Sequence, residues 1–254
     1  MAEAPSAAGP ARYHFDGDYE EQVVLKDGST AWLRLVRPDD KELLVRAFAH
    51  LSAQSRYRRF LADRTALSPR ELSYLTEVDG SSHFAIGAIR RRDGHPDEGL
   101  GIARFIRLPS RPEVAEAAVA VIDEMQRKGL GRLLLRRLAA AARERGVERF
   151  SCEVLQNNLP IQGILSELSL EPLRRAEDGV ISIEIDLSDL PELVMAPQGE
   201  AASGSSTWMP TLPKLPAIVE RLLALVAAGV VVVRQAVLLV SPHSDETSTE
   251  EPKA

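Results

Sequence analysis

The most regular hydrophobic pattern in the chain runs from residue 117 to residue 141. Residues 117–122 are small or β-branched without a break, which is typical of a buried strand. Farther along, apolar residues recur every three or four positions and predict an amphipathic helix. They are Leu130, Leu133, Leu134, Leu138 and Ala141. Because a glycine-bearing segment lies between these two patterns, the sequence predicts a strand, a loop and a helix in succession.

The other patterns predict further strands and helices. Two β-rich runs flank Asp27-Gly28 and indicate a hairpin. One helix is expected to begin near Pro38, and another at Ser68, an N-cap residue followed by proline. Strands are expected at 84–89, 100–106, 113–122, 149–155 and 180–186, and a further helix at 161–168. The expected order is a hairpin, two helices, three antiparallel strands, a helix, a strand, a helix and a strand.

The segment 52–60 carries three arginines and allows two interpretations. The arginines can hold an anion, or they can be the solvated end of a helix around buried Tyr57 and Phe60. We favour the second interpretation, because charged residues at a helix end usually face water.

Composition divides the chain into five parts. Residues 1–20 are rich in small residues, prolines and acids and are expected to be a flexible leader. Residues 21–190 are expected to form one folded domain. Residues 191–216 have the composition of a linker, 217–240 are expected to form an apolar helix, and 241–254 are an acidic tail expected to be disordered.

The apolar segment 217–240 is the one part of the chain that raises the question of a membrane. Its uninterrupted core, 222–233, is shorter than the roughly 20 residues that a span needs. An extension to Val240 includes Arg234, and an arginine in mid-span costs about 2.5–3.5 kcal/mol. We favour a helix that docks on the domain or on a partner subunit; peripheral membrane contact and disorder are the alternatives.

Charge and cysteine content exclude several classes of protein. The net charge of −6 argues against a nucleic-acid partner. The single cysteine, Cys152, excludes an intrachain disulfide and is expected to be a small buried hydrophobe. The first residues lack a secretion signal, so the cytoplasm is the expected compartment. No cluster has metal-ligand spacing, and His83 is expected to be structural.

The loop between the predicted strand and helix has the properties of an anion site. A helix N-terminus presents unpaired N–H groups and the positive end of the helix dipole. Gly129 and Gly131 allow a ligand to approach the backbone, and Arg127, Lys128 and Arg132 add positive charge. A pyrophosphate fits this description. The spacings GxxxxGK(S/T) and GxGxxG are both missing, which argues against a nucleoside triphosphatase and a dinucleotide fold.

The segment Gln126-Arg-Lys-Gly-Leu-Gly131 matches the pattern Q/R-x-x-G-x-G/A. With the strand before it and the helix after it, it resembles the acyl-coenzyme-A loop of the GNAT superfamily of N-acetyltransferases. The resemblance covers roughly residues 21–188. It implies a mixed α/β fold with a mostly antiparallel sheet, a central βαβ unit over residues 117–155 and flanking helices. It also implies acetyl-CoA as co-substrate and no metal.

Three further segments narrow the resemblance. Residues 33–40, 51–60 and 75–79 are similar to the acetyltransferase domain of bacterial Pat-type protein lysine acetyltransferases. Those enzymes typically couple this domain to a cyclic-AMP-binding domain or to an acyl-CoA-synthetase-like region. The segment before residue 21 is too short for either, so regulation is expected to differ from theirs.

The resemblance assigns the cofactor contacts by position. It implies that Val119, Ala120 and Val121 pair with the pantetheine amides and that the Val121 N–H meets the thioester oxygen. It implies that the loop holds the pyrophosphate through Gln126, Arg127, Lys128, Gly129, Leu130, Gly131 and Arg132. Asn158 is the expected contact to the pantetheine arm. Asn157 is an alternative, and both residues also suit an ordinary turn.

Glu116 is the candidate general base. It lies in Ala115-Glu-Ala-Ala-Val-Ala-Val121, which is similar to the sequence around the catalytic glutamate of Pat-type enzymes. A carboxylate ahead of alanines and valines is expected to be poorly solvated, which suits proton abstraction. The alternative is a glutamate at a strand end that faces water, with Glu113 as the second candidate base.

One departure concerns the leaving group. Many superfamily members place a tyrosine shortly after the Asn158 position, as the acid for the thiolate. All tyrosines here precede the loop, at positions 13, 19, 57 and 74, so the thiolate is expected to leave unaided or to take its proton from water. The sequence therefore predicts an N-acetyltransferase with a protein lysine as favoured acceptor. The alternatives are a small-molecule amine acceptor and a non-catalytic acyl-CoA-sensing module.

Overall fold

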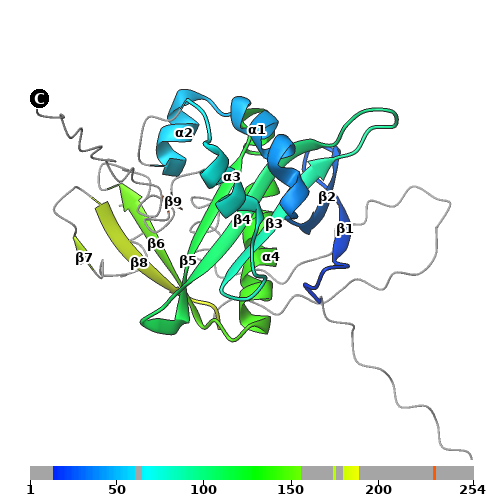
Figure 1. The fold of residues 1–254 in the computed structure, drawn as a ribbon. Coiled ribbons are helices and arrows are strands. Elements are labelled where there is room, and N and C mark those ends of the chain that lie inside the picture. Colours follow the sequence, from blue (N-terminus) through cyan, green and yellow to red (C-terminus); the bar gives the residue numbers. More distant parts are fainter. Residues whose placement is uncertain (1–13, 61–64, 156–173, 176–179, 189–230, 233–254) are drawn as a thin grey trace, which may run out of the picture.

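The computed structural model describes residues 14–60, 65–155, 174–175, 180–188 and 231–232. They form a sheet with helices on both faces (Figure 1). On one side lie α1 (Lys41–Ala49), α2 (Ala53–Phe60) and α3 (Pro69–Thr76), and α4 (Leu130–Glu144) covers the other face. Short 3-10 turns, η1 (Pro38–Asp40) and η2 (Asp123–Met125), precede α1 and the loop before α4. This arrangement is the mixed α/β fold that the sequence predicts.

The sheet order is β1-β2-β3-β4-β5-β6-β8-β7, with β9 on β6 beside this path. The strands are β1 (Glu20–Val24), β2 (Thr30–Leu35), β3 (His83–Arg90), β4 (Glu98–Leu108), β5 (Arg111–Val121), β6 (Arg149–Leu155), β7 (Arg174–Arg175), β8 (Val180–Asp186) and β9 (Val231–Val232). Among the described strand pairs only β5 and β6 run parallel. The predicted βαβ unit is therefore confirmed as β5–α4–β6 in an otherwise antiparallel sheet.

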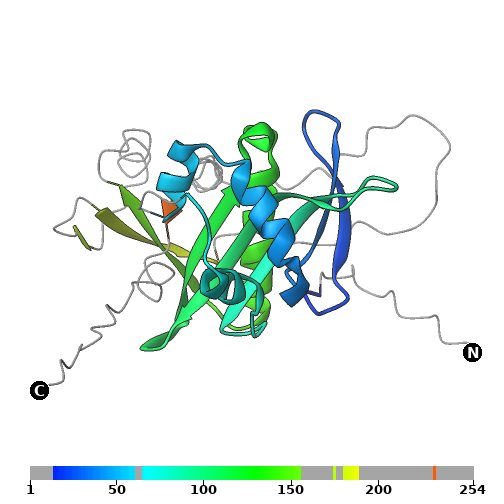
Figure 2. The ribbon, with the colours of Figure 1, turned by 45° about the horizontal axis from the view of Figure 1, so that its top comes forward.

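The strands β5 and β6 diverge after a short parallel ladder. The ladder ends where Glu116 pairs with Ser151, and Figure 1 shows the two strands separating from that point. The other edge of β6 pairs with β8 along the whole of β6. Because β9 pairs with β6 at Glu153 and Val154, it must use the edge that β5 has left. The strand β9 therefore lies in the gap between β5 and β6, close to α2 (Figure 2).

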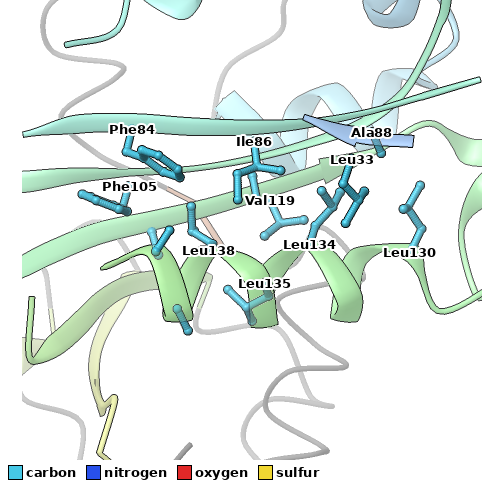
Figure 3. Packing of buried hydrophobic residues seen from close by; sticks show 14 of the residues in the cluster. Leu33, Phe84, Ile86, Ala88, Phe105, Val119, Leu130, Leu134, Leu135 and Leu138 are labelled. Carbon is cyan, nitrogen blue, oxygen red and sulfur yellow. The ribbon is translucent and has the colours of Figure 1, made fainter. Parts of the chain in front are cut away.

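The main core lies between the sheet and α4. Figure 3 shows Leu130, Leu134 and Leu138 of α4 directed at the sheet, where they meet the side chains of the central strands. All three leucines are fully enclosed, and burial of each is worth about 2 kcal/mol. The helix ends at Glu144, and Gly146 has φ of +75°, as expected for a glycine after a helix. The 3.6-residue pattern in the sequence thus predicts both the helix and its buried face.

The helices between β2 and β3 differ in one respect from the prediction. Residues 53–60 form the separate helix α2, so three helices stand where two were expected. The break between α1 and α2 falls at Ser52, whose hydroxyl accepts from the Ser55 N–H as an N-cap residue does. The predicted start at Ser68 is confirmed, because the Ser68 side chain accepts from the Glu71 N–H and Glu71 returns a bond to the Ser68 N–H.

Several predictions fall on residues outside the described part of the chain. They are the leader up to residue 13, the helix at 161–168, Asn157 and Asn158, the linker and the acidic tail. Of the helix predicted over 217–240, the structure describes Val231 and Val232 alone, and these form a strand. The helix prediction is wrong at these two residues, because a run of β-branched valines favours an extended backbone with an edge to pair with. None of the described helices has the length and apolarity that a membrane span requires.

Candidate functional site

The loop before α4 has an irregular backbone that suits an anion. Arg127 has φ of +62° and Gly129, the N-cap residue of α4, has φ of +91°, so two left-handed residues lie within three positions. Alternating backbone hand turns successive N–H groups toward one side of a loop. The N–H groups of Leu130, Gly131 and Arg132 follow, in the first turn of α4, where no intrahelical acceptor exists. The loop therefore aims several backbone donors at the space beside the helix N-terminus.

The hairpin between β1 and β2 touches this loop. The Asp27 carboxylate pairs with Lys128 at 2.9 Å, and the Lys26 N–H donates to the Lys128 carbonyl. The Ser29 hydroxyl, and then Lys128, lower the pKa of Asp27 well below its usual value. The Lys26 stem passes over Gly129, 3.4 Å from the place where a Cβ would stand. Lys128 is therefore already paired with a carboxylate, while Arg127 is exposed.

The Gln126 side chain turns back toward the protein. Its amide nitrogen lies 2.9 Å from Asp123, 3.2 Å from the Ser55 hydroxyl and 3.3 Å from the Val121 carbonyl. Asp123 also accepts from the Ser52 N–H and from the Ser55 hydroxyl. Gln126 and Asp123 thus fasten the loop to the start of α2. In this arrangement Gln126 shapes the loop and offers its backbone, rather than its side chain, to a phosphate.

The edge of β5 that faces the gap and β9 carries backbone groups that β4 does not use. The Ile122 N–H donates to Leu100 of β4, and every second residue back along β5 has the same orientation. The N–H groups of Val119 and Val121 therefore point away from β4, into the gap between β5 and β6. The Val121 carbonyl accepts from Gln126. Ala120 bonds with β4 through its backbone, and its side chain lines a cavity of about 70 Å³ under α1.

Glu116 lies where β5 and β6 begin to separate. It pairs with Ile106 of β4 and with Ser151 of β6, and it is partly buried. Because side chains alternate along a strand, Glu116 is on the same face as Ala120, the face that α1 and α3 cover. The second candidate base, Glu113, is paired at longer range with Arg111 and Arg149, at 3.7 and 3.5 Å.

His83 has a structural role at the start of β3, as the sequence predicts. Arg104, which is fully buried, lies 3.0 Å from the His83 Nε2 atom and also donates to the Leu75 carbonyl at the end of α3. Burial, and then the charge of Arg104, lower the pKa of His83 to about 4. A neutral imidazole therefore accepts a hydrogen bond from a buried guanidinium.

We expect this histidine to make the folded state sensitive to acid. The unfolded chain takes up the proton near pH 6.5 and the folded chain only near 4, so the contribution to stability is complete above pH 6.5 and is lost as the pH falls toward 4. Between pH 7 and pH 5 this loss amounts to about 1–2 kcal/mol. Urea denaturation of His83→Gln, whose amide oxygen still accepts from Arg104, should show a smaller loss over that interval. An identical loss in both proteins would contradict this assignment.

Three site features lie beyond the sequence motif. Asp27 is about a hundred residues from the loop in sequence, and Asp123 lies just before the matched pattern. Their contacts with Lys128 and Ser55 form only in the folded chain. Arg136 is visible in the sequence as a residue off the apolar stripe of α4, yet it is buried. Within the described ranges, no three His, Cys, Asp or Glu side chains are close enough to share a metal ion.

The chain is similar to several known acetyltransferases. The model of the acetyltransferase (GNAT) family matches residues 41–166. Acetyltransferase Pat of Mycolicibacterium smegmatis is 31% identical over 177 residues, which cover 69% of this chain and 51% of that protein. An acetyltransferase of Pseudomonas aeruginosa is 32% identical over 122 residues, 48% of this chain and 64% of its own length. The crystal structure of the GNAT domain of S. lividans PAT is 32% identical with a TM-score of 0.58, covering 68% of this chain and 99% of that one.

The chain belongs to the GNAT family of acetyltransferases. Within that family it is similar to Pat-type proteins, and it spans about half the length of the mycobacterial Pat. The family model covers the chain from α1 to β6, including α4 and the loop before it, so the predicted family and fold are both confirmed.

Proposed function

We propose that this protein transfers the acetyl group of acetyl-CoA to a primary amine, with a protein lysine as the favoured acceptor. The observation that carries the proposal is the loop of residues 126–131, in which left-handed Arg127 and Gly129 precede the open N-terminus of α4. This backbone fits a pyrophosphate, because the first turn of α4 presents N–H groups without intrahelical acceptors and the helix dipole adds positive charge. In the proposed complex Arg132 adds a guanidinium beside the first turn.

We propose that the pantetheine arm pairs with the β5 edge of the gap between β5 and β6, which requires β9 to leave its place beside that edge. The N–H groups of Val119 and Val121 point into this gap, and an arm with two amides is able to pair with such an edge as a strand does. One of these donors would then stabilise the thioester oxygen as negative charge develops on it, a contact worth about 3 kcal/mol in comparable sites. The resemblance to the superfamily implies Val121 for this role.

The position of Glu116 favours Val119 instead. Along an extended strand Glu116 is about 10 Å from Val119 and about 16 Å from Val121. A base and an oxyanion donor must serve the same reacting carbon, and the shorter separation is bridged more easily by the acceptor amine and a water. We therefore propose Val119 as the principal donor and Val121 as the contact to the next group of the arm.

The proposed reaction needs one base and no metal. Glu116 takes a proton from the acceptor ammonium, directly or through water, and the neutral amine attacks the thioester carbonyl. The tetrahedral intermediate then expels the thiolate of coenzyme A, and the second proton of the nitrogen passes through water to that thiolate. The products are the neutral amide and the free thiol, and the proton held by Glu116 goes to solvent.

A protein lysine is the favoured acceptor because the chain is similar to Pat-type acetyltransferases. Thiol release from acetyl-CoA with a panel of lysine-containing proteins and small amines tests this. We expect faster release with at least one protein and an acetylated lysine in its mass spectrum. Faster release with a small amine would indicate the small-molecule alternative. Tight binding of acetyl-CoA without release by any acceptor would indicate a non-catalytic sensing module.

A further inference from the structure

Arg136 of α4 is a buried cation for which the described residues supply no counter-charge. Arg136 is only 7% exposed. Within the part of the chain that the structure describes, it forms no ion pair and donates no hydrogen bond, and its Nε atom is enclosed without a partner. Most buried cations are paired, because an unpaired charge loses its hydration without recovering an equivalent interaction. Arg136 is therefore an exception that requires a reason.

Two neighbouring arginines make the charged form of Arg136 still less favourable. Burial, and then the charges of Arg132 and Arg137, lower the pKa of Arg136 to about 10. Arg137 is neutralised by Glu21, which accepts two hydrogen bonds of 2.7 Å from it. Arg136 lies on the side of α4 away from the leucines that face the sheet, one turn beyond Arg132.

The direction of the Arg136 side chain places this charge near the cofactor loop. Helical side chains lean toward the N-terminus, so Arg136 extends over the turn that contains Arg132. The two residues are one turn apart, about 6 Å along the axis. The terminal nitrogens of Arg136 are not among the enclosed unpartnered atoms, so the end of the guanidinium keeps some exposed surface.

We propose that Arg136 forms a second anion subsite beside the cofactor loop and holds the 3′-phosphate of the ADP ribose of coenzyme A. The inference rests on the co-substrate proposed above. The loop backbone accounts for the pyrophosphate, and the 3′-phosphate is the other phosphate group of the same molecule. A dianion at Arg136 supplies the missing counter-charge and a planar, two-point partner for the guanidinium.

Two ligands that differ only in this phosphate test the proposal. Calorimetry would measure the binding of acetyl-CoA and of acetyl-dephospho-CoA, which lacks the 3′-phosphate, to wild type and to Arg136→Met. Wild type should prefer acetyl-CoA by about 10- to 100-fold, the worth of one charge-assisted hydrogen-bonded contact. In Arg136→Met this preference should largely disappear, while binding of acetyl-dephospho-CoA stays within about threefold of wild type.

Arg143→Met is the matched control, since Arg143 is on the same side of α4 nearly two turns farther from the loop. It should retain the wild-type preference for the phosphorylated ligand. A second measurement separates a ligand site from a structural role. Loss of an uncompensated buried charge should raise the melting temperature of the ligand-free protein by about 2–4 °C in Arg136→Met, whereas loss of a structural contact would lower it.

The possible outcomes are distinct. Equal weakening of both ligands in Arg136→Met, or an undiminished preference for acetyl-CoA, would overturn the 3′-phosphate subsite and leave the proposed function standing. Failure of wild type to bind either ligand would instead remove the proposed function. A gain of thermal stability together with loss of the preference would support the subsite.

Discussion

Replacement of Glu116 by glutamine is expected to lower kcat by about 10²- to 10⁴-fold at neutral pH. Glutamine has nearly the same shape, but its amide does not accept the ammonium proton. The partly buried position at the divergence of β5 and β6 is retained, so binding of acetyl-CoA should change little. Steady-state thiol release gives kcat, and calorimetry gives the dissociation constant of acetyl-CoA.

Glu113→Gln is the control for this experiment. Glu113 is on the same strand, three residues earlier, and its carboxylate lies 3.7 Å from Arg111 and 3.5 Å from Arg149. We expect its kcat to remain within about threefold of wild type, as for most surface substitutions. A large loss in Glu113→Gln with normal turnover in Glu116→Gln would exchange the roles of the two carboxylates.

Replacement of Gly129 by valine is expected to weaken acetyl-CoA binding by about 10- to 100-fold. Gly129 has φ of +91°, a conformation that a β-branched residue rarely adopts, so the loop must change its course. One or two backbone N–H groups then no longer point at the pyrophosphate. Each charge-assisted hydrogen bond that is lost is worth about 1.5–3 kcal/mol. Calorimetric titration with acetyl-CoA measures the effect.

Gly94→Val separates this effect from a general loss of stability. Gly94 has φ of +74° in the turn between β3 and β4, and no atom lies within 4 Å of an added Cβ. Both variants therefore carry a similar backbone penalty, which thermal denaturation would measure. Normal acetyl-CoA binding is expected for Gly94→Val alone. Equal binding by both variants would mean that the turn at Gly129 has no role in holding the cofactor.

Local patterns predict much of this fold. The leucine stripe defines α4 and its buried face, and the serine and proline at 68 and 69 define the start of α3. The glycines at 129 and 131 sit where the strand–loop–helix pattern predicts them, at the N-terminus of α4. These features depend on neighbours in sequence, so a periodicity or a cap is enough to find them.

Other features depend on contacts between distant segments. Asp27 meets Lys128 across about a hundred residues, and Asp123 bonds with Ser55 of α2. The two valines of β9 form a strand because the edge of β6 is available to them, although their surroundings in sequence favour a helix. A single sequence has no signal for such pairings, since each partner looks like an ordinary surface or apolar residue.

The left-handed conformation of Arg127 has a consequence for ligand capture. For a residue with a side chain this geometry is unfavourable by about 1–2 kcal/mol. Here the free energy of folding offsets that strain before any ligand binds. The left-handed turn is thus present in the ligand-free chain. Asp27, through Lys128, and Asp123, through Gln126, hold the residues on either side of Arg127. The loop is therefore preorganised for a diphosphate, and little of the binding free energy is lost in ordering it.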